Sequence, residues 1–138
     1  IQKFIPILSE RTIVKDINIE RIKKIIIESS EQANRISVPE ITKLENLKSF
    51  LSNFPKKGCL VFCDINCDKN DLKNILSKKD LEPVCILIGP EGDFSENERK
   101  LIIDLEQSQS ISLAKNILRT ETAAIAAITL VNYNLNLS

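Results

Sequence analysis

The sequence contains no histidine, methionine or tryptophan, and it has one tyrosine and three glycines. Without histidine, the chain lacks the side chain that most often serves as a general base near neutral pH. No apolar run approaches the roughly 20 residues that a membrane-spanning helix needs. The first residues, Ile1 to Phe4, include no methionine and lack the charged-then-apolar layout of a signal peptide. We therefore expect a soluble, cytoplasmic protein without membrane contact, and we expect that Ile1 begins a fragment of a longer chain.

The chain carries no net charge, because 19 basic residues balance 19 acidic ones. A domain that binds RNA by itself usually has a basic excess, which displaces counterions from the phosphates. The balance therefore argues against a domain that grips RNA alone, but it leaves room for a local basic face or a further domain. The length of 138 residues, with 43% hydrophobic and 28% charged residues, fits a single domain over 1–138.

Four cysteines raise the question of a metal site, since Cys59, Cys63 and Cys67 are spaced four residues apart. The chain has neither histidine nor the close Cys-x-x-Cys pair that zinc sites usually contain. Cys59 and Cys63 also lie in an apolar run, where their even spacing places them on one face of a strand. We therefore expect buried, reduced thiols and no metal.

Apolar patterning and capping residues predict an alternation of strands and helices. The expected strands cover residues 4–8, 59–63, 84–88 and 111–113. The expected helices begin at Asn18, Thr42, Asp71, Ser95 and Thr120, with capping boxes at Thr42/Glu45 and Ser95/Glu98. Pro39 is expected to stop the first helix, and the last one runs to about Val131. Apolar strands that alternate with helices predict an α/β domain with a mainly parallel sheet flanked by helices.

The last expected helix has one charge in its first turn, Glu121, and almost none after it. A helix that is apolar on every side is usually buried. We therefore expect this helix to lie in the core or in an interface.

In open α/β sheets, ligands bind beyond the carboxyl ends of the strands, and two loops of this chain fall there. The first, residues 88–95, places Gly89 and Gly92 between a buried strand and a helix cap. Glycine lets the backbone approach a ligand closely, and Pro90 stiffens the turn. An ordinary Gly-Pro turn explains the same pattern. A phosphate-binding loop is excluded, because the Gly-Lys-Ser/Thr ending is absent.

The second loop, residues 113–123, places Arg119 and Glu121 on either side of Thr120. The dipole of the following helix favours Glu121 at this point. The two charges fit a solvated helix start, and they fit equally well a charged pair at the mouth of a ligand cleft. The residues alone leave both interpretations open.

Taken together, the segments "IGPEGDF", "ISL" and "ILRTETAA" resemble the paired signature loops of the ribosomal RNA small-subunit methyltransferase E family, in the SPOUT superfamily. Upstream, "IPILSERT" and "EQANRISVPEI" are similar to the segments that lead into that family's catalytic domain. The resemblance runs from about Phe4 to about Val131, and "LRTETAA" beside a "GPEG" turn is its most specific part.

The resemblance implies a SPOUT-type fold, in which the C-terminal segment threads through a loop to form a trefoil knot. It implies a homodimer that transfers a methyl group from S-adenosylmethionine to N3 of one uridine in the 16S rRNA of the small ribosomal subunit. It also implies an N-terminal RNA-binding barrel domain, which is absent from this chain.

The resemblance further implies roles for individual residues. The expected S-adenosylmethionine contacts are Ile88, Gly89, Glu91, Gly92, Leu113 and Leu118. Arg119 is expected to contact the RNA or orient the base, and Glu121 to hold Arg119 or the amino group of the cofactor. Arg11, Gln32 and Arg35 are expected RNA contacts, although an ordinary surface position fits Gln32 and Arg35 equally well.

The sequence departs from the family pattern in both loops. Asp93 stands where the family usually has glycine, and Ala114-Lys115-Asn116 stands where it usually has Gly-Pro-Arg. Asp93 loses the freedom of glycine at positive φ, and Ala114 narrows the space beside the ligand by a methyl group. Two alternatives follow: a SPOUT domain that binds RNA or ribosomal particles without catalysis, and an unrelated α/β nucleotide-binding module. Binding of S-adenosylmethionine but not of a nucleotide would exclude the second alternative.

Overall fold

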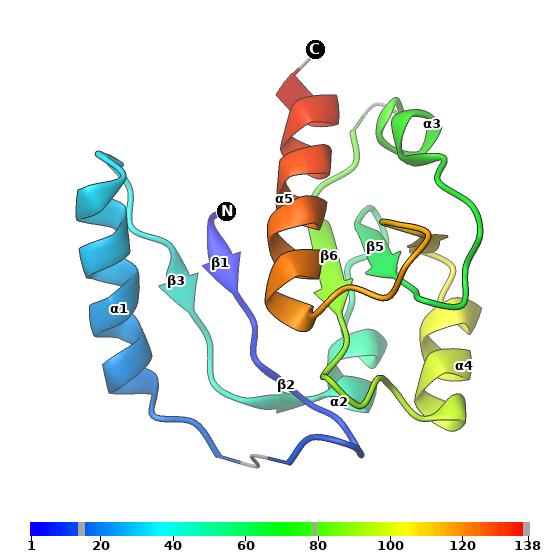
Figure 1. Cartoon of the computed structure of the whole chain (residues 1–138), viewed down its shortest axis with the longest axis horizontal. Coiled ribbons are helices and arrows are strands. Elements are labelled where there is room, and N and C mark those ends of the chain that lie inside the picture. The colour runs from blue at the N-terminus through cyan, green and yellow to red at the C-terminus, as the bar shows by residue number, and fades with distance from the viewer. Residues whose placement is uncertain (14–15, 79, 137–138) are drawn as a thin grey trace.

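The structure is a computed structural model that describes residues 1–13, 16–78 and 80–136 (Figure 1). Its elements are β1 (Lys3–Phe4), β2 (Ile7–Leu8), α1 (Ile19–Gln32), β3 (Glu40–Ile41), β4 (Glu45–Asn46), α2 (Leu47–Ser52), β5 (Cys59–Cys63), α3 (Leu72–Leu76), β6 (Val84–Ile88), α4 (Glu96–Asp104), β7 (Ser108–Ile111) and α5 (Thr120–Asn136). All the strand pairs are parallel and helices flank them, which confirms the expected α/β class. Within the described residues, no helix combines the length and apolarity needed to cross a membrane.

A three-stranded sheet in the order β6–β5–β7 forms the centre of the part that we call the body, residues 47–136. Cys63, the last residue of β5, pairs with Ile88 of β6 and with Ile111 of β7. These three residues are also the last of their strands. The strands therefore end together, at an edge that we call the carboxyl edge.

Helices cover both faces of this sheet. Leu60 and Phe62 of β5 belong to one apolar cluster, together with side chains of α2 and α4. Cys59 and Val61 belong to a second cluster, with Leu72 of α3 and side chains of α5. Successive strand residues point to opposite faces, so these two clusters place the sheet between two helical layers. This position explains why β5 is apolar throughout.

Helix α5 packs against β6 and α3 with one of its faces. Ala123, Ala127 and Val131 are buried, and their spacing of four residues places them on one face. Ile125 and Tyr133 are instead 69% and 64% exposed. Of the two expected places for this helix, the core or an interface, the core is confirmed for one face, while apolar side chains of the other face are exposed.

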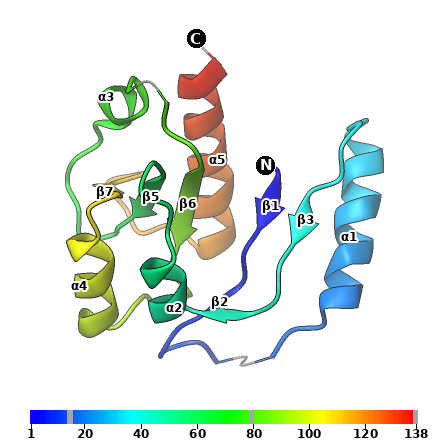
Figure 2. The same cartoon turned by 180° about the vertical axis from the view of Figure 1, so that it is seen from behind.

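The first 46 residues form an arm beside the body, as Figures 1 and 2 show. In this arm β1 pairs with β3 and β2 with β4, and α1 contacts β3. Asn18 caps α1 as expected, because its side-chain oxygen accepts a hydrogen bond from the Arg21 N–H at 3.0 Å. The helix ends at Gln32, and Asn34 follows in a left-handed conformation at φ 52°. Pro39 therefore lies beyond the helix end and does not set it.

The expected capping box at Thr42 and Glu45 is wrong. The N–H groups of these residues donate to Phe4 and Pro6 carbonyls, at 3.0 and 3.1 Å, and so join the arm's strands. The next helix is α2, and its cap is Asn46, whose side chain accepts from the Ser49 N–H at 2.8 Å. Residues 42–45 therefore pair with the strands near the N-terminus in place of starting a helix. A local capping pattern does not detect such pairing with a distant segment.

Two later boundaries also differ from expectation, while the capping box at Ser95 is confirmed. The strand expected at 111–113 is β7 at Ser108–Ile111, a polar strand apart from its last residue. Thr120 was expected to cap the last helix. It is instead the first residue of α5, and its hydroxyl donates to the Gly89 carbonyl at 3.3 Å.

Candidate functional site

Three segments leave the sheet at the carboxyl edge: residues 64–71 after β5, 89–95 after β6 and 112–119 after β7. The Ser112 N–H donates to the Lys69 carbonyl at 2.7 Å, which joins the first segment to the third. The Thr120 hydroxyl bonded to Gly89 joins the third segment to the second. The parallel topology thus brings together loops that lie far apart in the sequence.

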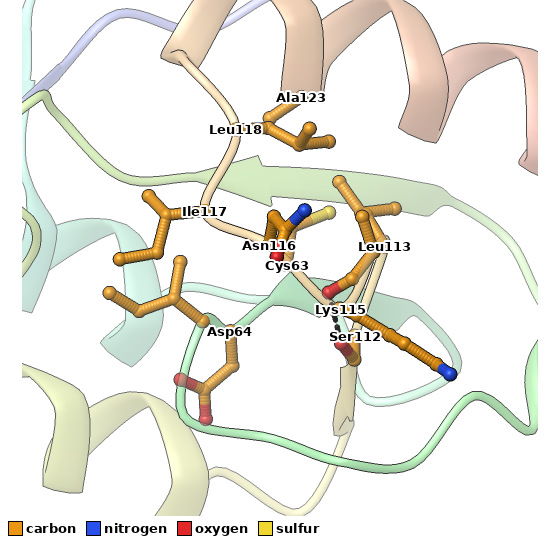
Figure 3. A pocket seen from close by; sticks show the side chains of 11 residues that line it. Cys63, Asp64, Ser112, Leu113, Lys115, Asn116, Ile117, Leu118 and Ala123 are labelled. Atoms are coloured by element: carbon orange, nitrogen blue, oxygen red, sulfur yellow. Dashed lines mark hydrogen bonds between the residues drawn. The ribbon is translucent and has the colours of Figure 1, made fainter.

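A pocket opens at this edge, and Figure 3 shows its walls. Its lining comes from the end of β5, the loop after β7 and the first turn of α5: Cys63, Asp64, Ile65, Ser112, Leu113, Ala114, Lys115, Asn116, Ile117, Leu118 and Ala123. In Figure 3, Leu113, Ile117 and Leu118 are arranged around Cys63, while the Asp64 carboxylate points away from them. The walls of the pocket are therefore largely apolar.

The loop that forms one side of this pocket keeps its backbone donors free. Among the described residues, none accepts a hydrogen bond from the backbone N–H groups of residues 113–118. Backbone N–H groups in folded proteins nearly always bond to protein, water or ligand. Apolar walls beside unused backbone groups suit a ligand with an aromatic ring and polar edges.

The Cys63 thiol contributes to the wall as a neutral group. Burial raises its pKa to about 12, so the thiol stays protonated at physiological pH. A thiol in this state is a poor nucleophile and a poor metal ligand. All four cysteines are free, and burial likewise raises the pKa values of Cys59 and Cys85. No group of three or more metal-binding side chains forms in the described part of the chain.

Asp64 also lines the pocket, but its carboxylate is engaged elsewhere. Arg99 of α4 donates to both carboxylate oxygens, from Nη2 at 2.8 Å and from Nε at 3.3 Å. The Asn66 N–H donates to Oδ1 at 3.0 Å. The hydrogen bonds that Arg99 donates to Asp64 are the main cause that raises the pKa of Arg99 above its usual value. A ligand in the pocket therefore meets a carboxylate whose oxygens are already occupied.

The loop after β6 is a tight turn that glycine and aspartate make possible. The Asp93 N–H donates to the Pro90 carbonyl at 2.8 Å, and Asp93 takes the left-handed φ of 60°. Aspartate is one of the few residues that tolerate this region, which explains how it can stand where the family pattern has glycine. A Cβ on Gly89 would approach Asp93 Oδ1 to 3.1 Å and the Phe94 ring to 3.3 Å, so this position favours glycine.

The expected cofactor contacts fall into two groups. Leu113 and Leu118 line the pocket. Ile88, Gly89, Glu91 and Gly92 do not line it; Ile88 is the last residue of β6, and the other three lie on the adjacent segment after that strand. The hydrogen bond between Thr120 and Gly89 holds the two groups together.

Arg119 and Glu121 are both exposed at the point where the pocket loop becomes α5. Within the described residues, no hydrogen bond or ion pair joins their side chains. The Arg119 carbonyl accepts from the Ala123 N–H at 2.8 Å and begins the helix. Arg119 directly follows Leu118, which places it beside the pocket with its guanidinium unpaired in this part of the chain.

The expected RNA contacts are separated in space. The Arg11 guanidinium donates to the Gly92 carbonyl at 3.0 Å, so the side chain of Arg11 contacts the loop after β6. Gln32 is the last residue of α1, and Arg35 follows in the chain beyond the helix cap. This end of α1 lies at the far end of the arm in Figure 1. Arg35 donates to the Ile1 carbonyl at 2.8 Å. The structure thus brings Arg11 to the candidate site but not Gln32 or Arg35.

Four residues of this region were not singled out from the sequence. Asp64 directly follows an expected strand, and that position alone was a usable signal for the carboxyl edge. Ile65 and Ile117 were hidden, because an apolar residue in a loop has no distinctive pattern. Arg99 is recognised only through its tertiary partner.

The parallel sheet, the apolar pocket at its carboxyl edge and the two joined loops define an α/β domain with a candidate site for a small ligand. The chain belongs to the family of RNA methyltransferase domains, whose family model matches residues 1–132. This match confirms the resemblance that the loop sequences carry.

The curated relatives that the chain matches include the ribosomal RNA small subunit methyltransferase E of Rickettsia conorii. It is 34% identical over 129 residues, which cover 93% of this chain and 52% of the relative. The corresponding protein 1 of Borreliella burgdorferi is 33% identical over 105 residues, which cover 76% and 43%. The chain thus spans about half the length of these relatives.

Solved structures agree in fold. The ribosomal RNA small subunit methyltransferase E of Neisseria gonorrhoeae, bound to S-adenosyl methionine, aligns with a TM-score of 0.81 and 30% identity, covering 94% of this chain and 53% of that one. A methyltransferase of Legionella pneumophila in complex with the same cofactor aligns with a TM-score of 0.80 and 29% identity, covering 94% and 54%.

Proposed function

We propose that this chain is the methyl-transfer domain of an enzyme that modifies small-subunit ribosomal RNA with S-adenosylmethionine. The observation that carries the proposal is the apolar pocket at the carboxyl edge, with its unused backbone donors. S-adenosylmethionine supplies a methyl group on a sulfonium, and its adenine and lack of phosphate suit such a pocket. Similarity to two proteins whose structures contain this cofactor supports the same conclusion.

Within this proposal, the two loops of the carboxyl edge share the work of binding the cofactor. Leu113 and Leu118 supply apolar walls for the adenine. The segment Ile88–Gly92, which includes Gly89 and Glu91, supplies backbone groups from the neighbouring loop. Together the two loops are proposed to orient the methyl donor toward its acceptor. Correct orientation of two reactants contributes much of the rate enhancement of a direct methyl transfer.

The proposed acceptor is N3 of a uridine in 16S rRNA. N3 loses its proton as it gains the methyl group, and a nearby cation stabilises the negative charge that develops on the base. Arg119 is the proposed catalytic cation, because it is exposed beside Leu118 and no described carboxylate pairs with it. Glu121, in the first turn of α5, is proposed to orient Arg119 or the cofactor's amino group once substrates are bound. N3 lies on the pairing edge, so the base must be unpaired or flipped to react.

The RNA is proposed to cross the loop after β6, where Arg11 lies, and to extend along the arm toward Gln32 and Arg35. The chain has no net charge, so we propose that a further domain, the barrel implied by the resemblance, supplies additional grip. Ribosomal RNA as the substrate implies action in the cytoplasm.

The proposed assembly is a homodimer that covers the exposed face of α5. Ile125 and Tyr133 on that face are apolar or aromatic, and both are largely exposed. A surface of this kind is typical of interfaces rather than of solvated helices. The trefoil knot of the SPOUT fold belongs to the same proposal, and the joined loops after β6 and β7 are compatible with it.

Calorimetric titration of the chain with S-adenosylmethionine, with ATP as the control ligand, tests the proposal. We expect saturable binding at about micromolar strength and none for ATP. Arg119→Ala should keep this affinity and lose most methylation of small-subunit RNA, whereas Lys73→Ala, an exposed change on α3, should keep both. Absence of cofactor binding would overturn the domain's proposed role, and near-normal turnover of Arg119→Ala would overturn the assignment of Arg119.

A further inference from the structure

An ion pair between Asp64 and Arg99 links the pocket to helix α4. The Asp64 side chain is 2% exposed and that of Arg99 is 28% exposed, and the guanidinium contacts both carboxylate oxygens. The other ion pair in the described part of the chain, Lys23–Glu20, lies within the exposed surface of α1. Among the described residues, Asp64–Arg99 is therefore the one ion pair that joins two different segments of the fold, and it lies at the candidate site.

Asp64 organises the turn that forms one wall of the pocket. Its N–H donates to the Ile111 carbonyl at 3.0 Å, and its carbonyl accepts from the Cys67 N–H at 3.2 Å. Its carboxylate accepts from the Asn66 N–H. Ile65 stands between these anchored residues, is 52% exposed, and lines the pocket. The exposure of Ile65 on an ordered turn leaves it available to a ligand.

Arg99 connects this turn to the other loop of the site. It lies in α4, the helix that the loop after β6 enters through the capping box at Ser95. A displacement of α4 would therefore pull on Asp64 as well as on the loop after β6. The two oxygens that Arg99 contacts leave the planar guanidinium little freedom, so the link transmits position as well as charge.

We propose that the Asp64–Arg99 ion pair is a positioning device that holds Ile65 as a preformed wall of the cofactor pocket. The inference rests on the proposed function, and it adds two positioning residues that act through Ile65 rather than by contact with the ligand. Preorganisation of a binding wall raises affinity, because the cost of ordering the wall does not fall on the binding step.

The test measures the dissociation constant for S-adenosylmethionine in Arg99→Met, Arg99→Lys and Ile65→Ala chains. Arg99→Met removes the pairing and leaves a buried carboxylate, and we expect the dissociation constant to rise about tenfold. Arg99→Lys retains the charge and should recover part of the affinity. Lys100→Met is the matched control, since Lys100 is the exposed neighbour on α4, and it should bind like the wild type.

A double-mutant cycle separates positioning from mere stabilisation. If the pair acts through Ile65, then Ile65→Ala weakens binding in the wild type and adds little in Arg99→Met, since the wall is already displaced. Amide exchange at Asn66 and Cys67 should also accelerate in Arg99→Met. Fully additive effects of the two substitutions on affinity would overturn the inference. So would unchanged affinity in an Arg99→Met chain whose melting temperature has fallen.

Binding of S-adenosylmethionine by the wild-type chain distinguishes a failure of the positioning role from a failure of the proposed function. A wild-type chain that binds S-adenosylmethionine, with an unchanged dissociation constant in Arg99→Met, overturns the positioning role alone. A wild-type chain that does not bind overturns the proposed function and, with it, the inference that depends on it.

Discussion

The arm and the body of this protein contain similar apolar side chains but use them differently. Every hydrophobic residue of the buried core lies in the body, from Leu47 to Val131. The described part of the arm contributes Pro39 and two buried polar residues, Ser9 and Ser30, while Ile13 and Ile36 are almost fully exposed. Apolar content therefore does not define a core. A core forms where two faces meet, and the central sheet meets helices on both faces, whereas the strands of the arm contain two residues each.

Few specific contacts fix the arm to the candidate site. The Glu10 N–H donates to Glu98 Oε2 at 3.2 Å, and the Arg11 guanidinium donates to Gly92. Glu98 is buried, and its other oxygen accepts from the Ser95 N–H at 3.1 Å in the capping box. One carboxylate thus serves the start of α4 and the attachment of the arm. Replacing one carboxylate oxygen of Glu98 by a nitrogen should therefore weaken the junction, by which we mean the contact of the arm with the start of α4.

The largest expected effect is the loss of stability when a core side chain of the body is truncated, compared with the same truncation in the arm. Ile102 is fully buried in the body, and Ile25 on α1 is 50% exposed. Ile102→Ala should lower the free energy of unfolding by about 2–5 kcal/mol, because it leaves a cavity. Ile25→Ala should change it by less than about 1 kcal/mol. Denaturant unfolding of both variants checks this, and equal losses would show that the arm shares the core of the body.

An intermediate effect is expected at the junction, from Glu98→Gln. The amide keeps one accepting oxygen and presents an NH2 donor in place of the other, so one of the two backbone N–H groups loses its partner. We expect a loss of about 1–3 kcal/mol in unfolding free energy. Hydrogen exchange at the Glu10 amide should accelerate.

Glu96→Gln is the matched control for this substitution. Glu96 lies in the same first turn of α4, is exposed, and loses the same charge near the helix dipole. Equal losses in the two variants would assign the effect to the dipole and contradict the role of Glu98 as a shared acceptor.

The smallest expected effect is the pH dependence that a buried thiol gives to the unfolding free energy. This effect belongs to the body, since all four cysteines lie there. The folded pKa of Cys63 is raised to about 12, so its contribution to stability is complete below the unfolded pKa of about 8.5 and is lost as pH rises toward the folded value. Between pH 8.5 and 9.5 the unfolding free energy should fall by about 1 kcal/mol for this thiol.

Cys63→Ala provides the comparison for the pH series. Its absolute stability will be lower because a buried sulfur is removed, so the slope against pH is the quantity to compare. The slope of the variant should be shallower than that of the wild type over this range. Identical slopes would contradict the pKa shift of Cys63.

The body could be predicted from the sequence better than the arm, for a physical reason. Cys59–Cys63 and Val84–Ile88 are apolar throughout, a pattern typical of strands buried on both faces, and both were placed correctly. The capping box at Ser95 and Glu98 is a local pattern that the structure confirms. Thr42 and Glu45 have the same spacing, but their amides pair with the strand at Phe4 and Pro6, so the local pattern was overridden.

The candidate site could be predicted in the same uneven way. The loop motifs located the carboxyl edge, and Leu113 and Leu118 do line the pocket there. The sequence did not separate residues of the pocket loop from those of the adjacent turn, because both follow a strand and both contain distinctive residues. The roles of Arg119 and Glu121 stay predictions: within the described residues no ion pair joins the two side chains, and the other partner expected for Glu121 was the cofactor.

The sequence by itself determined the family, the parallel α/β class and the two loops that meet at the carboxyl edge. These depend on local features: strand periodicity, caps, and motifs whose residues are contiguous. Only the tertiary structure decided that Asp64 meets Arg99, that Glu98 holds Glu10, and that Thr120 bonds to Gly89. Each of these contacts joins residues at least 31 positions apart, and the last two span 88 and 31 positions. Such contacts depend on how the sheet aligns its strands, because chain spacing places no constraint on which distant side chains become neighbours.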